Sequence, residues 1–170
     1  MTICDFPASS KLASELSRAF YHDSYEAPLK RADLAMHEIY LAILGHLPWW
    51  ARVLIVVRNN IVSLFGLRVE PAARVWRTEF KDSYVPGEKI ARFKLYSQNQ
   101  SEIIAGENDK HLDFRVSVLK VSESGTNKVI VSTVIFAHNL FGKVYLLFVL
   151  PFHRFGLRHL LSQAVIRERI

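Results

Sequence analysis

Apolar and polar residues alternate through much of the second half of the chain. The clearest case is "HLDFRVSV" (111–118), in which every second residue is apolar and the others are polar or charged. Successive side chains of a strand point to opposite faces, so this pattern predicts a strand with one apolar face. The same period predicts strands at 92–98, 101–106, 111–121, 128–138 and 143–150. Short turn signals separate them, which indicates antiparallel neighbours in a meander.

The first half of the chain has mainly a helical period. Residues 9–20 carry Leu and Phe at fourfold spacing and predict a short helix, capped by Ser9 or Ser10. Alternation at 20–29 predicts one strand. Residues 31–45 and 48–66 carry apolar side chains three and four positions apart, on either side of "GHLP", so we expect an αα-hairpin there.

The segment between this hairpin and the meander is less regular. "VWRTEF" (75–80) is consistent with a strand and "YVPGEK" (84–89) with a turn. After the last predicted strand, Pro151 suits the first position of a helix that continues to the C-terminus. This final helix is the expected cover for the apolar face of the sheet.

These elements predict an α+β protein with a single domain over residues 1–170. Residues 1–19 would form an N-terminal extension or short helix, and residues 20–170 the core. The element order resembles that of the START/Bet v 1-like superfamily, the helix-grip proteins. The resemblance implies a curved antiparallel sheet wrapped around a long C-terminal helix, with the αα-hairpin after the first strand.

Charge, cysteine content and hydropathy argue against several classes of protein. The chain has 170 residues, half of them apolar, and a formal charge of +6 without a concentrated basic block, so we expect no nucleic-acid partner. The single cysteine, Cys4, cannot form an internal disulfide. The most apolar window, 47–67, contains Arg52 and Arg58, and a spanning helix needs about 20 residues with few charges. We therefore expect no transmembrane segment and a cytoplasmic protein.

The polar row of residues 111–118 carries the candidate chemistry. Antiparallel pairing of 111–121 with 128–138 would bring His138 near His111 or Asp113. A His–Asp pair can orient an imidazole for proton transfer, and two His with an Asp can hold a metal, but a purely structural polar ladder is the favoured interpretation. Each Val, Leu or Phe left exposed forfeits about 1.5–3 kcal/mol, which favours the apolar row facing inward. If instead the polar row faced inward, its side chains would line a cavity.

Several short motifs resemble the bacterial family catalogued as domain of unknown function 2867. They are "DKHLDFR" (109–115), "HN" before a Gly turn (138–142), a following Tyr, "PFHR" (151–154), "PW" (48–49) and "RN" (58–59). The resemblance implies no activity, but it marks residues to examine. The candidate ligand-binding residues are Trp49, Arg58, Asp109, His111, Asp113, Arg115, His138, Asn139, Tyr145, His153 and Arg154, and His111, Asp113 and His138 are also the catalytic candidates.

Three functions remain open. The first is binding of a small hydrophobic or amphipathic ligand in a cavity between the sheet and the C-terminal helix, which the aromatic content favours. The second is a cyclase-like or hydrolase-like enzyme of the same fold that uses His and Asp as acid and base. The third is a membrane-surface or protein-interaction module led by Trp49 and Trp50. We expect no metal and no cofactor, and an oligomer is compatible with the sequence.

Overall fold

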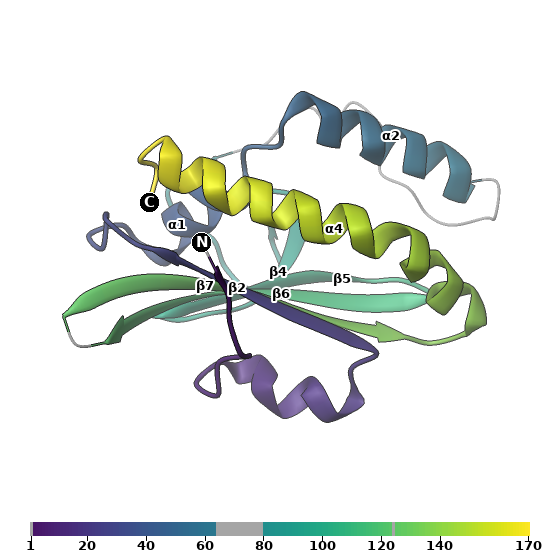
Figure 1. Ribbon diagram of the computed structural model, residues 1–170, viewed down its shortest axis with the longest axis horizontal. Coiled ribbons are helices and arrows are strands. Elements are labelled where there is room, and N and C mark those ends of the chain that lie inside the picture. Colours follow the sequence, from purple (N-terminus) through teal and green to yellow (C-terminus); the bar gives the residue numbers. More distant parts are fainter. Residues whose placement is uncertain (1, 64–79, 124) are drawn as a thin grey trace.

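The computed structural model describes residues 2–63, 80–123 and 125–170. Within these residues, seven strands form one antiparallel sheet in the order β1-β2-β7-β6-β5-β4-β3. Long helix α4 (Leu140–Ile166) lies across one face of the sheet (Figure 1). The strands are β1 (Thr2–Ile3), β2 (Tyr21–Pro28), β3 (Lys89–Ile90), β4 (Phe93–Gln98), β5 (Glu102–Asn108), β6 (Leu112–Glu123) and β7 (Thr126–Ala137).

The strands predicted at 20–29, 92–98, 101–106, 111–121 and 128–138 are confirmed as β2, β4, β5, β6 and β7. The first long strand, β2, pairs with the last, β7, so the meander is closed on one side by a strand from the start of the chain. In the β6–β7 hairpin Leu112 lies opposite Ala137, which brings the start of β6 beside the end of β7, as the sequence indicates.

The two faces of the sheet bury different sets of residues. Phe114, Val116 and Val118, the apolar row of β6, pack into the main core with α4 and with helix α1 (Met36–Leu44). On the opposite face a smaller cluster of Ile104 and Val134 is covered by the N-terminal helix. The apolar row therefore faces α4 and the polar row faces away from it.

The N-terminal helix predicted at 9–20 is a 3-10 helix, η1 (Lys11–Arg18), drawn in purple below the sheet in Figure 1. Ser10 is its N-cap and its hydroxyl accepts a hydrogen bond from the Leu12 amide. Leu12 is buried against the sheet, and Leu16 packs against the same cluster. This helix is a second cover for the sheet and no loose extension.

The expected αα-hairpin is only partly present. Both helices exist, α1 and α2 (Trp49–Ser63), but the chain turns by 78° between 36–44 and 49–57 and the helices do not run antiparallel. Residues 36–44 are buried against the sheet, whereas α2 lies outside α4 (Figure 1). The ring centroid of Trp50 lies 5.4 Å from that of Phe155 and 5.5 Å from that of His159, both on α4. Helix α2 therefore packs along α4 and does not form an antiparallel pair with α1.

The strand predicted at 143–150 is wrong, as is the start of the last helix at Pro151. Helix α4 begins at Leu140, and Pro151 lies inside it. The reason is the cap: the Asn139 side chain accepts a hydrogen bond from the Gly142 amide at 3.0 Å, which starts the helix directly after β7. An uninterrupted apolar run such as "VYLLFVL" fits a helix as well as a strand, and here tertiary packing decides.

The region between α2 and β4 contains a confirmed turn. Gly87 adopts φ 102°, which favours glycine, and its amide donates to the Leu95 carbonyl at 2.8 Å. The strand predicted at 75–80 lies outside the described residues, apart from Phe80, which is in an irregular segment.

Candidate functional site

Helix η1 is fixed to the sheet by a buried carboxylate. Glu102 on β5 is almost fully buried and accepts hydrogen bonds from Ser10 Oγ at 2.5 Å and from Ser117 Oγ at 2.6 Å. Its second oxygen accepts the Lys11 amide at 3.1 Å. The carboxylate therefore accepts hydrogen bonds both from the start of η1 and from a hydroxyl on β6. These bonds hold η1 over the face of the sheet opposite α4.

A pocket of about 460 Å³ opens between the C-terminal end of η1 and the sheet. Its wall combines the start of β6, the end of β7 and the first turn of α4 with the chain that leaves η1. The lining residues are Glu15, Arg18, Ala19, Phe20, Asp113, Arg115, Phe136, Ala137, His138 and Lys143. Three predicted site residues thus line one pocket, on the face of the sheet opposite the long part of α4.

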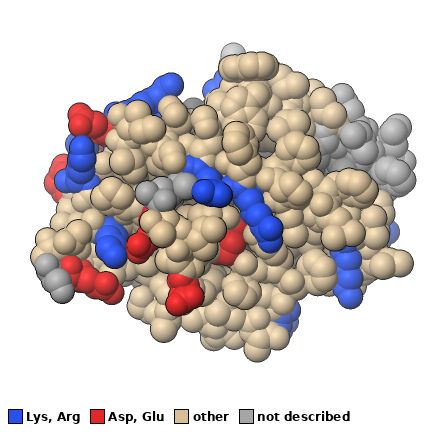
Figure 2. Space-filling model, in the orientation of Figure 1, with Lys and Arg blue, Asp and Glu red and all other residues tan. Residues whose placement is uncertain are grey.

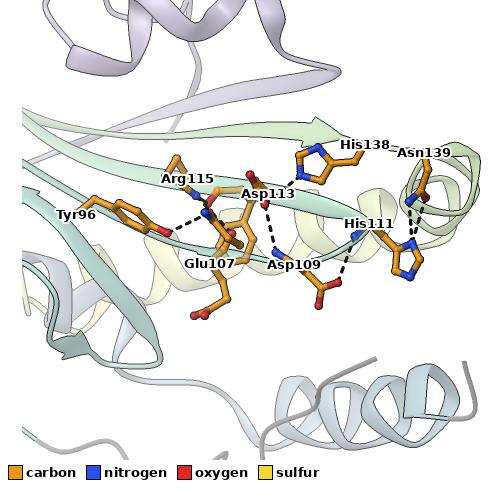
Figure 3. Close-up of polar contacts among 10 residues, drawn as sticks. Tyr96, Glu107, Asp109, His111, Asp113, Arg115, His138 and Asn139 are labelled. Carbon is orange, nitrogen blue, oxygen red and sulfur yellow. Dashed lines mark hydrogen bonds and ion pairs between the residues drawn. The ribbon is translucent and has the colours of Figure 1, made fainter. Parts of the chain in front are cut away.

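Asp113 and His138 are in direct contact at this pocket. His138 Nε2 lies 3.1 Å from Asp113 Oδ1, and the two side chains point toward one another in Figure 3. Asp113 Oδ1 also accepts the Asp109 amide at 3.2 Å. The carboxylate is thereby held by a backbone donor while it orients the imidazole, which lies at the pocket wall and is partly exposed.

The positive charges of the pocket outnumber its negative ones. Arg115 stacks on Tyr96, with its guanidinium carbon 3.8 Å from the ring centroid. Lys143 Nζ lies 5.8 Å from the ring centroid of Phe20. Within the described part of the chain neither cation is paired with a carboxylate, whereas Arg18 is paired with Glu15 at 3.6 Å and Asp113 with His138.

The rest of the predicted polar row diverges from this pocket. His111 precedes β6, and its Nδ1 lies 2.9 Å from Asn139 Nδ2, at the start of α4 (Figure 3). Its ring packs on Phe141 at 4.6 Å between centroids. The Asp109 carboxylate accepts the His111 amide at 3.3 Å. These residues close the loop before β6 and cap α4. They do not line the pocket, but the Asp109 amide contacts Asp113, which does.

A second polar cluster lies on the α4 face of the sheet. Asp23 on β2 accepts hydrogen bonds from the hydroxyls of Tyr21 at 2.7 Å and Tyr25 at 3.2 Å. His153 Nε2 lies 3.4 Å from Asp23 Oδ2, and Arg154 Nε donates to the Tyr21 hydroxyl at 2.9 Å. The predicted residues His153 and Arg154 therefore join α4 to β2 and do not line the pocket.

The environment of Asp23 keeps it ionised. Burial raises the pKa of the carboxyl, but the hydrogen bond and charge of His153 and the hydrogen bond of Tyr21 outweigh it, so the pKa lies below its usual value. Burial and the neighbouring Asp23 raise the pKa of Tyr25 to about 12. Both phenols thus stay protonated donors to a charged acceptor at neutral pH.

The remaining predicted residues are not brought to the pocket. Trp49 is 74% exposed at the start of α2, and Tyr145 is half-buried on α4. The side chain of Arg58 lies outside the described residues. Burial raises the pKa of the Cys4 thiol, and Glu26 and Asp5 add to the effect, so the thiol is not activated.

Neither the pocket wall formed by η1 nor the Asp23 cluster was predicted from the sequence. Tyr21, Asp23 and Tyr25 alternate in one strand, so a carboxylate between two phenols on one face was visible in the sequence. Nothing local indicated that His153 would meet it. Arg18 and Phe20 gave no signal, because their role depends on where η1 packs.

No group of three or more His, Cys, Asp or Glu residues suited to a metal ion occurs in residues 2–63, 80–123 and 125–170.

The fold and the pocket define an α+β protein in which a seven-stranded antiparallel sheet, counted over the described residues, carries a helical cover on each face. The model of the family described as "Protein of unknown function (DUF2867)" matches residues 16–160, and the chain belongs to this family. No curated protein and no solved structure matches the chain.

Proposed function

We propose that the protein binds a small amphipathic ligand with an anionic group in the pocket between η1 and the sheet. The observation that carries this proposal is the pair of cations, Arg115 and Lys143, that line the pocket without a carboxylate partner among the described residues. A volume of about 460 Å³ lies within the range of small-molecule sites.

The pocket offers an apolar surface beside these charges. Phe20, Phe136 and Ala137 line it together with the cations. An aromatic or short aliphatic carboxylate would place its apolar part on these side chains and its carboxylate near Lys143 and Arg115. Charge-assisted hydrogen bonds of this kind are stronger than neutral ones, so they would set the orientation of the ligand.

The architecture supports a helix-grip fold related to START/Bet v 1-like proteins. An antiparallel sheet, a long C-terminal helix on one face and helices after the first long strand are compatible with it. The proposed site nevertheless differs from the expected cavity beneath the C-terminal helix. Toward the end of α4 that space is filled by Leu157, Leu161 and Ala164, which are buried in the main core.

Isothermal titration calorimetry with 2-naphthoate tests the proposal, with 2-naphthylmethylammonium as the cationic counterpart. We expect the anion to bind and the cation not to bind. Lys143→Met should weaken binding about fivefold, since an exposed charge pair is worth up to about 1 kcal/mol. Lys30→Met is the matched control, because Lys30 is an exposed lysine outside the pocket. Equal binding of both probes, or equal effects of both variants, would contradict the proposal.

The Asp113–His138 contact favours a second candidate function, acid–base catalysis on the bound ligand. With Asp113 holding one nitrogen, the imidazole could take a proton from water that attacks an ester, and later return it to the leaving oxygen. Hydrolysis of p-nitrophenyl benzoate by the wild-type chain, lost in His138→Gln while 2-naphthoate still binds, would support this function. Equal rates for both chains would exclude it for this ester.

A further inference from the structure

The outer side of α4 carries a continuous row of exposed apolar side chains. Leu147 and Phe148 expose 69% and 71% of their surface, and the other members lie three or four residues apart along the same side. The row consists of Leu140, Val144, Leu147, Phe148, Phe152 and Phe155. Isolated exposed apolar residues are common, but a contiguous patch of this kind marks an interaction surface.

Helix α2 extends this row. Trp50 packs on Phe155 of α4, and the exposed residues of α2 therefore lie on the side of the molecule where α4 is exposed. Trp49 is 74% exposed at the start of α2. Among the side chains of α2 that the structure describes, Trp49, Val53, Leu54 and Val57 are exposed and apolar. We call the two rows together the α2–α4 apolar surface.

The charges on these helices have one sign. Residues 140–166 contain three Lys or Arg, residues 49–63 contain two, and neither segment contains Asp or Glu. In Figure 2 the acidic side chains gather at the left and lower parts of the visible face, away from α2. A second copy seated on this surface would bring like charges together, whereas an anionic lipid surface would complement them.

We infer that the α2–α4 apolar surface binds to anionic membrane surfaces. An apolar helix face flanked by basic residues is the usual composition of a helix that lies in the membrane interface. Phe148 and Phe152 would enter the boundary between headgroups and acyl chains, and Arg158, which is exposed on α4 three residues after Phe155, would meet the phosphates. This inference is independent of the pocket under η1.

The packing of α4 indicates that it lies on the membrane and does not cross it. Among the described residues α4 is long and apolar enough to span a bilayer, and 17% of its most apolar stretch is buried. Its inner side, however, contributes Leu146, Leu157 and Leu161 to buried positions against the rest of the fold. Insertion across a bilayer would remove these side chains from the core, so we expect only the outer side to meet lipid.

Flotation of the full chain with vesicles tests the inference. We expect binding to equimolar phosphatidylcholine and phosphatidylglycerol, little binding to pure phosphatidylcholine, and weaker binding as salt rises because surface charges are screened. Phe148→Ser should lower the partition coefficient about tenfold or more, because the buried Phe surface is lost. Phe80→Ser is the matched control, since Phe80 is 58% exposed outside the α2–α4 apolar surface.

Three results would overturn the inference. The first is no flotation with either vesicle, and the second is an equal loss for Phe148→Ser and Phe80→Ser. The third is a dimer in size-exclusion chromatography with light scattering that Phe148→Ser dissociates, without flotation of either chain; that result would assign the surface to a second copy. Circular dichroism and thermal unfolding of each variant would show that the fold is retained.

Discussion

Ser10 donates a hydrogen bond to Glu102 across 2.5 Å although 92 residues separate them in the chain. The same carboxylate accepts from Ser117 and from the Lys11 amide, so one buried group links the N-terminal helix to two neighbouring strands. This link places η1 over the sheet and thereby forms one wall of the pocket.

Removing this link should destabilise the protein. Glu102→Ala leaves the hydroxyls of Ser10 and Ser117 buried without their acceptor, and we expect a loss of about 1–3 kcal/mol in the free energy of unfolding. The same variant should weaken 2-naphthoate binding, because η1 is released from the sheet. Urea unfolding measures the first effect. Glu107→Ala, at an exposed position of the same strand, is the control and should change stability by less than about 0.5 kcal/mol.

The two glycines of α4 should respond in opposite ways to alanine. A Cβ at Gly142 would lie 2.2 Å from the His111 carbonyl oxygen, so Gly142→Ala must displace the start of α4 and should cost about 1–3 kcal/mol. At Gly156 the nearest atom to an added Cβ is 4.0 Å away, on Trp50. Gly156→Ala should therefore stabilise the helix by about 0.5–1 kcal/mol. Thermal unfolding of both variants compares them directly, and equal shifts would contradict the packing described for His111.

The inner and outer sides of α4 should differ in their contribution to stability. Leu161 is fully buried, so Leu161→Ala should cost about 2–5 kcal/mol through lost burial and the cavity left behind. Leu147 is 69% exposed, and Leu147→Ala should change stability by less than about 0.5 kcal/mol. Chemical denaturation of the two variants makes the comparison. A large effect at Leu147 would mean that its side chain is covered in solution.

Acid should weaken the contact between α4 and β2. The pKa of Asp23 is lower in the folded chain than the usual value, so its ionisation stabilises the fold fully above that usual value, about 3.9. The contribution is lost as the pH falls through the folded pKa. In Asp23→Asn this part of the pH dependence should disappear. Unfolding free energies of both chains between neutral pH and acid would show it, and parallel curves would refute the role of the Asp23–His153 contact.

The sequence predicted the positions of the strands well because apolar and polar residues alternate along much of the second half of the chain. Alternation predicted β6 and β7 and favoured an inward-facing apolar row on β6, and antiparallel pairing correctly placed His138 near Asp113. The start of α4 was not predictable in the same way. Residues 144–150 form an uninterrupted apolar run that fits a helix as well as a strand, and the choice depends on the Asn139 cap and on packing against His111.

The candidate site was less accessible to sequence reasoning. Asp113, Arg115 and His138 were found, but the pocket exists only because η1 packs on the sheet through Glu102. Contacts between residues this far apart leave no local pattern. For the same reason His153 was predicted as a site residue, but its contact with Asp23, 130 residues earlier in the chain, was not predicted.

The position of the bound ligand tests most directly whether the pocket under η1 is the binding site. Amide chemical shifts of the isotopically labelled chain, followed during titration with 2-naphthoate, would locate it. We predict that the shifts concentrate at the pocket, at Arg18, Phe20, Asp113, His138 and their neighbours. Shifts concentrated at Asp23, His153 and Leu157 would place the ligand between the sheet and α4, and no shifts at all would remove the ligand-binding function proposed for the pocket.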